Sequence, residues 1–138
     1  MKIFLVCMLA IALSGCIIAR APVRERVVDN LEEKSTTRFS VPPAVYDKAM
    51  LLLVTKTNLP NDWNAKIVVR TKLQTISESV RTKGLEKANY FEREGLMTYI
   101  ISDVKLPLQS GIPTEFQLEF ESPHRLEGAS LWISYIKW

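Results

Sequence analysis

The feature that most constrains the fold is a strict alternation of polar and apolar residues over positions 115–121, which read EFQLEFE. Phe116, Leu118 and Phe120 fill every second position. Because successive side chains of a β-strand point to opposite faces, this pattern predicts a strand with one buried and one solvated face. A helix would need apolar residues at spacings of three and four, which this segment lacks.

Four other segments indicate strands. The apolar run at 50–54 is short and flanked by turn-forming residues, which favours a strand covered on both faces. Residues 67–73, 96–104 and 131–135 alternate in polarity or are rich in β-branched and aromatic residues. Five strands with short polar connections and no long intervening helices predict a mainly β fold, an antiparallel β-sandwich with little helix.

Two segments are compatible with more than one structure. Ile76 and Val80 either continue the preceding strand or form a short helix. The polar stretch 81–95 suits a helix with one apolar face, but equally a loop or a crossing between the two sheets.

The start of the chain differs from the rest. Lys2 is followed by the apolar run 3–13, and that run ends in Leu13-Ser14-Gly15-Cys16. As a helix rising about 1.5 Å per residue, the run is too short for a hydrocarbon core of roughly 30 Å, but it fits the core of an export signal. The last four residues resemble the bacterial lipoprotein signal, in which lipid is attached to the cysteine and the chain is cut before it. The resemblance implies a signal peptide at 1–15 and palmitate-containing lipid on Cys16.

The resemblance also implies a cellular location for the rest of the chain and leaves it without a reactive cysteine. In such lipoproteins an aspartate after the cysteine retains the protein in the inner membrane, so Ile17 implies the outer membrane, with the protein facing the periplasm. Cys7 lies in the signal and Cys16 would be acylated, which leaves neither a free thiol nor a disulfide. The formal net charge of +3 for the whole chain is too small to indicate nucleic acid as a partner.

Polar and charged residues dominate positions 16–40, and we expect a lipidated tether there, followed by the β-sandwich domain at 41–138. Val27, Val28 and Leu31 have the spacing of one helical turn, but a solvated linker is the preferred interpretation.

No residue pattern indicates catalysis. His124 is the single histidine and has no Asp, Glu or Cys at ligand spacing. Glu115, Glu119 and Glu121 share one strand face, where alternation with phenylalanine explains them as solvated residues. The chain contains no nucleophile motif and no glycine-rich phosphate loop. We therefore expect no enzymatic activity, no metal and no cofactor apart from the covalent lipid.

Aromatic side chains are the candidates for binding a partner. Trp132 is out of step with Leu131, Ile133 and Tyr135, so it should lie on the outer face of its strand. An aromatic residue on an outer sheet face often anchors a partner, although segment 81–95 could instead cover it, or the strand could be buried on both faces. The candidate partner-binding residues are Trp132, Tyr99, Phe91 and Trp138.

Two stretches resemble a family of small β-sandwich outer-membrane lipoproteins that includes YbaY and the type III secretion pilotins YscW and ExsB. The first runs from Leu59-Pro60 through Ala65-Lys66-Ile67-Val68-Val69. The second is IPTEFQLEF at 112–120, followed eleven residues later by Leu131-Trp132-Ile133. The region 81–104 departs from what is expected of YbaY.

The resemblance implies a pilotin, a chaperone that binds a segment near the C-terminus of a secretin subunit and brings it to the outer membrane through the lipid on Cys16. The alternative is a structural lipoprotein subunit of a type IV or type VI secretion system or another envelope complex. A module that binds a soluble ligand or an inhibitor target is a third class. In each case the membrane is contacted through the lipid anchor.

Overall fold

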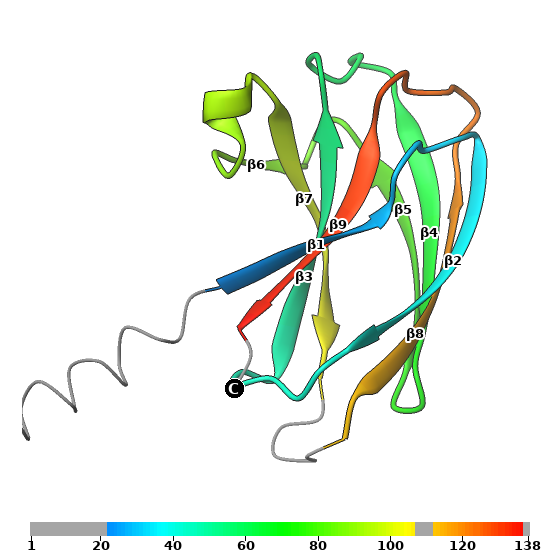
Figure 1. Ribbon diagram of the computed structural model, residues 1–138. Coiled ribbons are helices and arrows are strands. Elements are labelled where there is room, and N and C mark those ends of the chain that lie inside the picture. Colours follow the sequence, from blue (N-terminus) through cyan, green and yellow to red (C-terminus); the bar gives the residue numbers. More distant parts are fainter. Residues whose placement is uncertain (1–21, 107–111, 137–138) are drawn as a thin grey trace, which may run out of the picture.

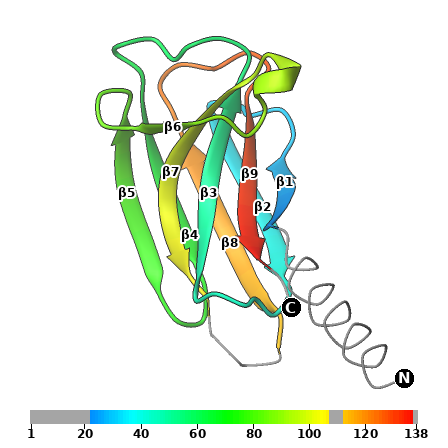
Figure 2. The same cartoon turned by 90° about the vertical axis from the view of Figure 1, so that its left-hand side faces the viewer.

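The computed structural model describes residues 22–106 and 112–136, which form two antiparallel β-sheets packed face to face (Figure 1). One sheet has five strands in the order β1-β9-β3-β7-β6, and the other has four in the order β2-β8-β4-β5. Figure 2 views the five-stranded sheet from outside, with the four-stranded sheet behind it. This architecture confirms the predicted antiparallel β-sandwich with little helix. The elements are β1 (Pro22–Val28), β2 (Lys34–Val41), β3 (Lys48–Thr55), β4 (Asn64–Arg70), β5 (Thr75–Arg81), β6 (Glu86–Ala88), the 3₁₀ turn η1 (Glu92–Glu94), β7 (Met97–Lys105), β8 (Thr114–Glu121) and β9 (Ser130–Ile136).

The core lies between the sheets and is built from alternate residues of the central strands. Phe116, Leu118 and Phe120 of β8 are buried there, as their alternation predicts. Trp63, in the connection between β3 and β4, is also buried and stacks on Phe120 with ring centroids 6.3 Å apart. Burying a large apolar side chain contributes roughly 1.5–3 kcal/mol to stability. Residues 22–106 and 112–136 contain no cysteine, so within them this core stabilises the sandwich.

The prediction of a tether over residues 16–40 is wrong for the part that the structure describes. β1 pairs with β9 from Pro22 onward, and β2 pairs with β8 along its whole length. The hydroxyl of Thr37 donates a hydrogen bond of 3.3 Å to the carbonyl of Val27, which links the two sheets on this side. The sandwich therefore begins at residue 22 rather than at residue 41.

The composition of this segment hides its strands because both lie at sheet edges. An edge strand has solvent on one side and tolerates charged residues that a central strand would exclude. Arg24 and Arg26 alternate along β1, and Phe39 is the one aromatic residue of β2. Val27 and Val28 belong to β1, so the helical turn considered for them does not form.

β4 and β5 form a hairpin where the sequence predicts one strand over 67–73. The backbone N–H of Thr71 donates to the carbonyl of Gln74 at 2.9 Å, and the Thr71 hydroxyl accepts from the backbone N–H of Leu73 at 3.2 Å. These bonds close a tight turn immediately after Arg70. Ile76 and Val80 follow in β5, so they form neither a short helix nor a continuation of the preceding strand but a separate strand after the turn.

Segment 81–95 is neither a long helix nor a simple loop. It contains β6, which pairs with β7 at the sheet edge, and then η1, a single 3₁₀ turn. Gly95 ends that turn at φ 72°, a left-handed conformation that glycine adopts without steric cost.

Candidate partner-binding site

β3 is buried on both faces, as the apolar run at 50–54 predicts. Leu51 and Leu53 face the core, whereas Leu52 faces outward and is nevertheless 0% exposed. Leu52 pairs with Trp132 of β9 on one side and with Ile100 of β7 on the other. The outer face of the five-stranded sheet thus carries a second apolar cluster.

Phe91 is the residue that covers Trp132. Its ring lies 4.7 Å from the Trp132 ring, centroid to centroid, at an interplanar angle of 49°. Phe91 immediately precedes η1, so the turn holds it against the sheet. The alternative that segment 81–95 covers Trp132 is therefore confirmed, although both rings remain partly exposed.

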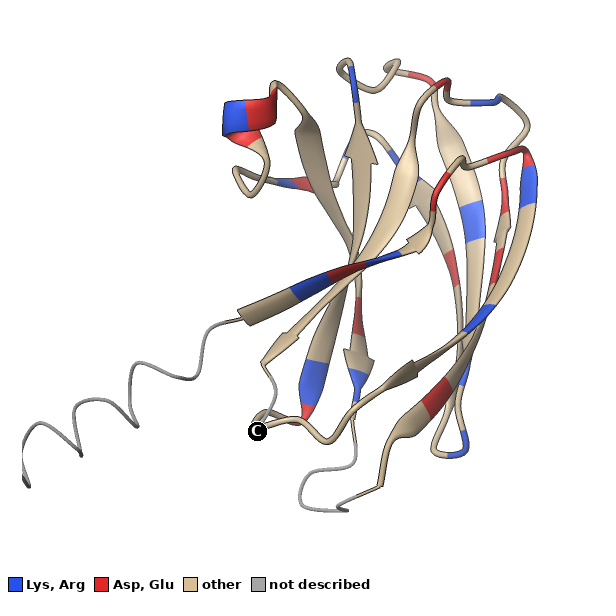
Figure 3. Cartoon of the chain, viewed as in Figure 1, with Lys and Arg blue, Asp and Glu red and all other residues tan. Residues whose placement is uncertain are grey.

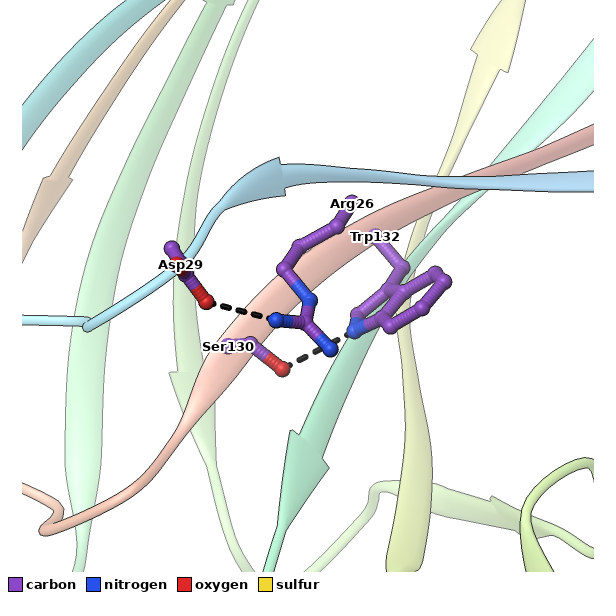
Figure 4. A network of polar contacts seen from close by, with 4 residues as sticks. All are labelled: Arg26, Asp29, Ser130 and Trp132. Atoms are coloured by element: carbon purple, nitrogen blue, oxygen red, sulfur yellow. Dashed lines mark hydrogen bonds and ion pairs between the residues drawn. The ribbon is translucent and has the colours of Figure 1, made fainter.

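Arg26 contacts Trp132 from β1, its pairing partner in the sheet (Figure 4). The guanidinium carbon lies 5.0 Å from the Trp132 ring centroid, within the range of a cation–π interaction. Arg26 is oriented by Asp29, to which its Nη1 donates at 2.6 Å, and the indole Nε1 of Trp132 donates to the Ser130 hydroxyl at 2.9 Å. The indole is thus held by a hydrogen bond and a cation, while part of its surface stays accessible.

A pocket of about 460 Å³ opens beside this cluster, between β1, β3, β9 and segment 81–95, which contributes Tyr90. Arg24 and Tyr90 form one wall, and the Arg24 guanidinium carbon lies 4.0 Å from the Tyr90 ring centroid. Tyr46 and Met50 add apolar surface, and Asp103 adds a carboxylate. An apolar floor with charges of both signs at its rim suits an amphipathic peptide segment.

Tyr135 fixes β1 to β9 at the edge of this pocket. Its hydroxyl donates a hydrogen bond of 2.9 Å to the carboxylate of Glu25. Burial, and then the hydrogen bond and negative charge of Glu25, raise the pKa of Tyr135 to about 12. The phenol therefore stays protonated at neutral pH and acts as a structural link across the strand pair.

The structure brings together two of the four predicted aromatic residues, Trp132 and Phe91. Tyr99 does not belong with them, because it points into the core, is 2% exposed, and accepts a hydrogen bond of 3.0 Å from the backbone N–H of Leu59. The assignment of Tyr99 to a binding surface is thus corrected to a core role. Trp138 and Cys16 lie outside the described residues.

Sequence reasoning missed Arg24, Arg26 and Tyr90. The two arginines appeared to belong to a linker, so nothing placed them beside Trp132. A signal was present, since Val23 and Glu25 interleave with them at strand spacing. Tyr90 precedes Phe91 in a stretch whose path depends on tertiary contacts.

No group of three or more His, Cys, Asp or Glu in residues 22–106 and 112–136 is arranged to hold a metal ion. His124 is exposed in the connection between β8 and β9. Neither of these two stretches contains a helix long and apolar enough to cross a membrane.

No protein-family model matches this chain, and no curated protein matches it. The fold and the surface therefore define the protein only as a β-sandwich with a partly covered aromatic outer face.

Proposed function

We propose that this protein is an outer-membrane lipoprotein that binds a partner protein, and that it acts as a pilotin, a chaperone for secretin targeting and assembly in a secretion system. The observation that carries the proposal is the partly exposed Trp132–Phe91 pair beside a mixed apolar and charged pocket. Interface anchors are typically aromatic residues and arginines, which are the residue types gathered here. The lipoprotein signal ending in Cys16 supports the membrane address.

The mechanism is physical rather than chemical. An amphipathic segment of the partner would place its apolar side chains in the pocket between Tyr90 and Met50, and its charged groups near Arg24 and Asp103. Phe91 and Trp132 would contact the rest of the segment. Because the lipid on Cys16 commits the complex to the outer membrane, the bound partner travels with it.

The first test uses an isolated peptide from the C-terminus of a secretin encoded by the same bacterium, labelled for fluorescence anisotropy. The full-length lipidated protein should bind it, and Tyr90→Ala should weaken binding about tenfold or more, as expected for an aromatic anchor. Lys83→Ala, an exposed residue in the β5–β6 connection far from the pocket, is the matched control and should bind normally.

The second test is genetic. Deleting the gene should leave a secretin monomeric or mislocalised when membranes are separated and multimers are resolved by gel electrophoresis. If every secretin of the cell remains multimeric and correctly placed, the pilotin proposal is wrong. Retention of the protein in an assembled type IV or type VI complex, without binding to the free peptide, would support the alternative of a structural subunit.

A further inference from the structure

Three of the most exposed large apolar side chains lie at one end of the sandwich. Tyr46 is 58% exposed in the β2–β3 connection, Leu73 is 60% exposed in the β4–β5 turn, and Ile112 is 68% exposed just before β8. The strand register places all three connections at the end where β1 begins, since Pro22 pairs with Ile136 at that end. We call this the proximal end; it is the lower end of the molecule in Figures 1 and 2.

The proximal end also carries several cations. Lys48, Lys72 and Lys105 lie in its connections or at the strand ends beside them, and within the described residues they form no ion pair. Figure 3 shows blue at the lower ends of β3 and β7 and in the β4–β5 turn, together with red on the lower parts of β7 and β8. The β1–β2 connection at the opposite end instead carries three carboxylates and no cation: Asp29, Glu32 and Glu33. Asp47, Asp103 and Glu115 also lie at the proximal end, and Lys56, Lys83 and Arg125 lie at the opposite end, so each end carries charges of both signs. The cations nearest in sequence to the exposed apolar side chains are Lys48 and Lys72.

The chain enters the sandwich at this end, where β1 begins. Cys16 is six residues before Pro22, and six residues span at most about 20 Å when fully extended. A strand of eight residues such as β3 is about 26 Å long. An anchor at Cys16 would therefore hold the proximal end closer to the membrane than the length of the domain itself.

We propose that the proximal end docks on the membrane surface, with Tyr46, Leu73 and Ile112 in the interfacial region and the lysines facing anionic phosphatidylglycerol headgroups. The proposal rests on the lipid anchor of the proposed function. Tyr46 and Lys48 also line the pocket proposed for the partner, so the docked end and a bound partner would share these two residues. Exposed apolar side chains bordered by cations are what an anionic lipid interface binds. Docking in this way turns the outer face of the five-stranded sheet sideways, so that Trp132 and Phe91 face along the membrane.

The test places a polarity-sensitive fluorophore at Leu73→Cys in the full-length lipidated protein, reconstituted into vesicles of phosphatidylethanolamine and phosphatidylglycerol. Labelling is specific because the expected mature chain has no other free thiol. The probe should shift its emission to the blue and be quenched by brominated lipids. Lys83→Cys at the opposite end is the control and should show neither effect. Both positions are exposed, so neither substitution disturbs the core.

Two further measurements test the contribution of charge attraction to docking. Lys48→Glu combined with Lys105→Glu should reduce the quenching at position 73, and so should vesicles of phosphatidylcholine alone, because both remove the charge attraction. A protein that is lipidated and vesicle-bound but shows equal, unquenched emission at positions 73 and 83 overturns the docking proposal while leaving the pilotin proposal intact. If the probe at position 73 is quenched but the protein binds no secretin peptide, the docking proposal is supported and the pilotin proposal is overturned. If Cys16 carries no lipid, both the anchor and the docking proposal are refuted.

Discussion

Phe91 and Trp132 face each other across the outer surface of the five-stranded sheet, with ring centroids 4.7 Å apart and a tilt of 49°. Trp132 comes from a regular strand, whereas Phe91 comes from an irregular segment that folds back over it. Through this contact Phe91 covers part of the apolar outer face of the sheet. Leu52 beneath is fully buried, whereas the two rings remain partly exposed and available to a partner.

Replacing Phe91 with alanine should expose Trp132 without unfolding the sandwich. We expect a red shift in tryptophan emission and greater quenching by acrylamide, because the ring of Trp132 becomes more exposed to water. Trp63 stays buried in the core, so its own emission should not change. The stability loss should be about 1–2 kcal/mol in chemical denaturation, since the removed ring is only partly buried. Tyr46→Ala is the control and should leave the emission unchanged. Unchanged emission in Phe91→Ala would contradict the covering role of Phe91.

The hydrogen bond between Tyr135 and Glu25 predicts a specific alkaline behaviour. The pKa of Tyr135 in the folded protein, about 12, lies above the ordinary tyrosine pKa of 10.0. The stabilisation is therefore fully present below pH 10 and is lost as the pH rises from 10 toward 12. Denaturation at a series of pH values should show this loss, and Tyr135→Phe should diminish it.

Glu25→Gln separates the causes of that shift. It removes the negative charge while keeping a hydrogen-bond acceptor, so the pKa of Tyr135 should fall but remain above 10.0, because burial is the largest cause. Absorbance of tyrosinate measures this directly. If the pKa of Tyr135 is the same in Glu25→Gln as in the unsubstituted protein, the carboxylate of Glu25 does not contribute to the raised pKa.

Leu52 tests the burial of β3 on its outer face. Leu52→Ala should cost about 2–5 kcal/mol, the range for a fully buried leucine, even though its side chain points away from the main core. Leu73→Ala, at an exposed turn, should change the stability by less than about 0.5 kcal/mol. Similar effects of the two substitutions would mean that the outer cluster is not packed.

The N-terminal boundary of the domain can be tested by truncation. A chain that starts at residue 22 should fold cooperatively, whereas one that starts at residue 41 lacks β1 and β2 and leaves β9 and β8 with unpaired edges. We expect the shorter chain to be aggregated or to lack a cooperative transition in circular dichroism. Equal stability of the two chains would restore the tether interpretation.

Cys16→Ser tests the lipid. The substitution should abolish incorporation of labelled palmitate and release the protein from the membrane fraction, because the thiol that accepts the lipid is gone. Membrane extraction identical to that of the unsubstituted protein would contradict lipidation at this residue.

The central strands could be predicted because burial dictates their residues. Phe116, Leu118 and Phe120 alternate strictly because one face meets the core, and the run at 50–54 is continuous because both faces are covered. The edge strands β1 and β2 could not be recognised, because solvent on one side removes that constraint and admits arginine and threonine. β6 has three residues, too few for any period to appear.

Only part of the candidate site could be predicted from the sequence. The outward direction of Trp132 follows from its phase in β9, and the involvement of segment 81–95 was one of the alternatives. The inward position of Tyr99 did not emerge, since its neighbours Thr98 and Ile100 are also compatible with burial and β7 is irregular between its pairs with Leu51 and Leu52.

By itself, the sequence determined the fold class, the buried faces of the central strands and the expectation of a lipoprotein signal ending in Cys16, because these depend on local periodicity and local motif. Only the tertiary structure decided that residues 22–40 belong to the domain and that Arg26 and Phe91 meet Trp132. It also decided that Tyr46, Leu73 and Ile112 share one end. Those relationships join segments far apart in the chain, and no local pattern encodes which strand lies beside which.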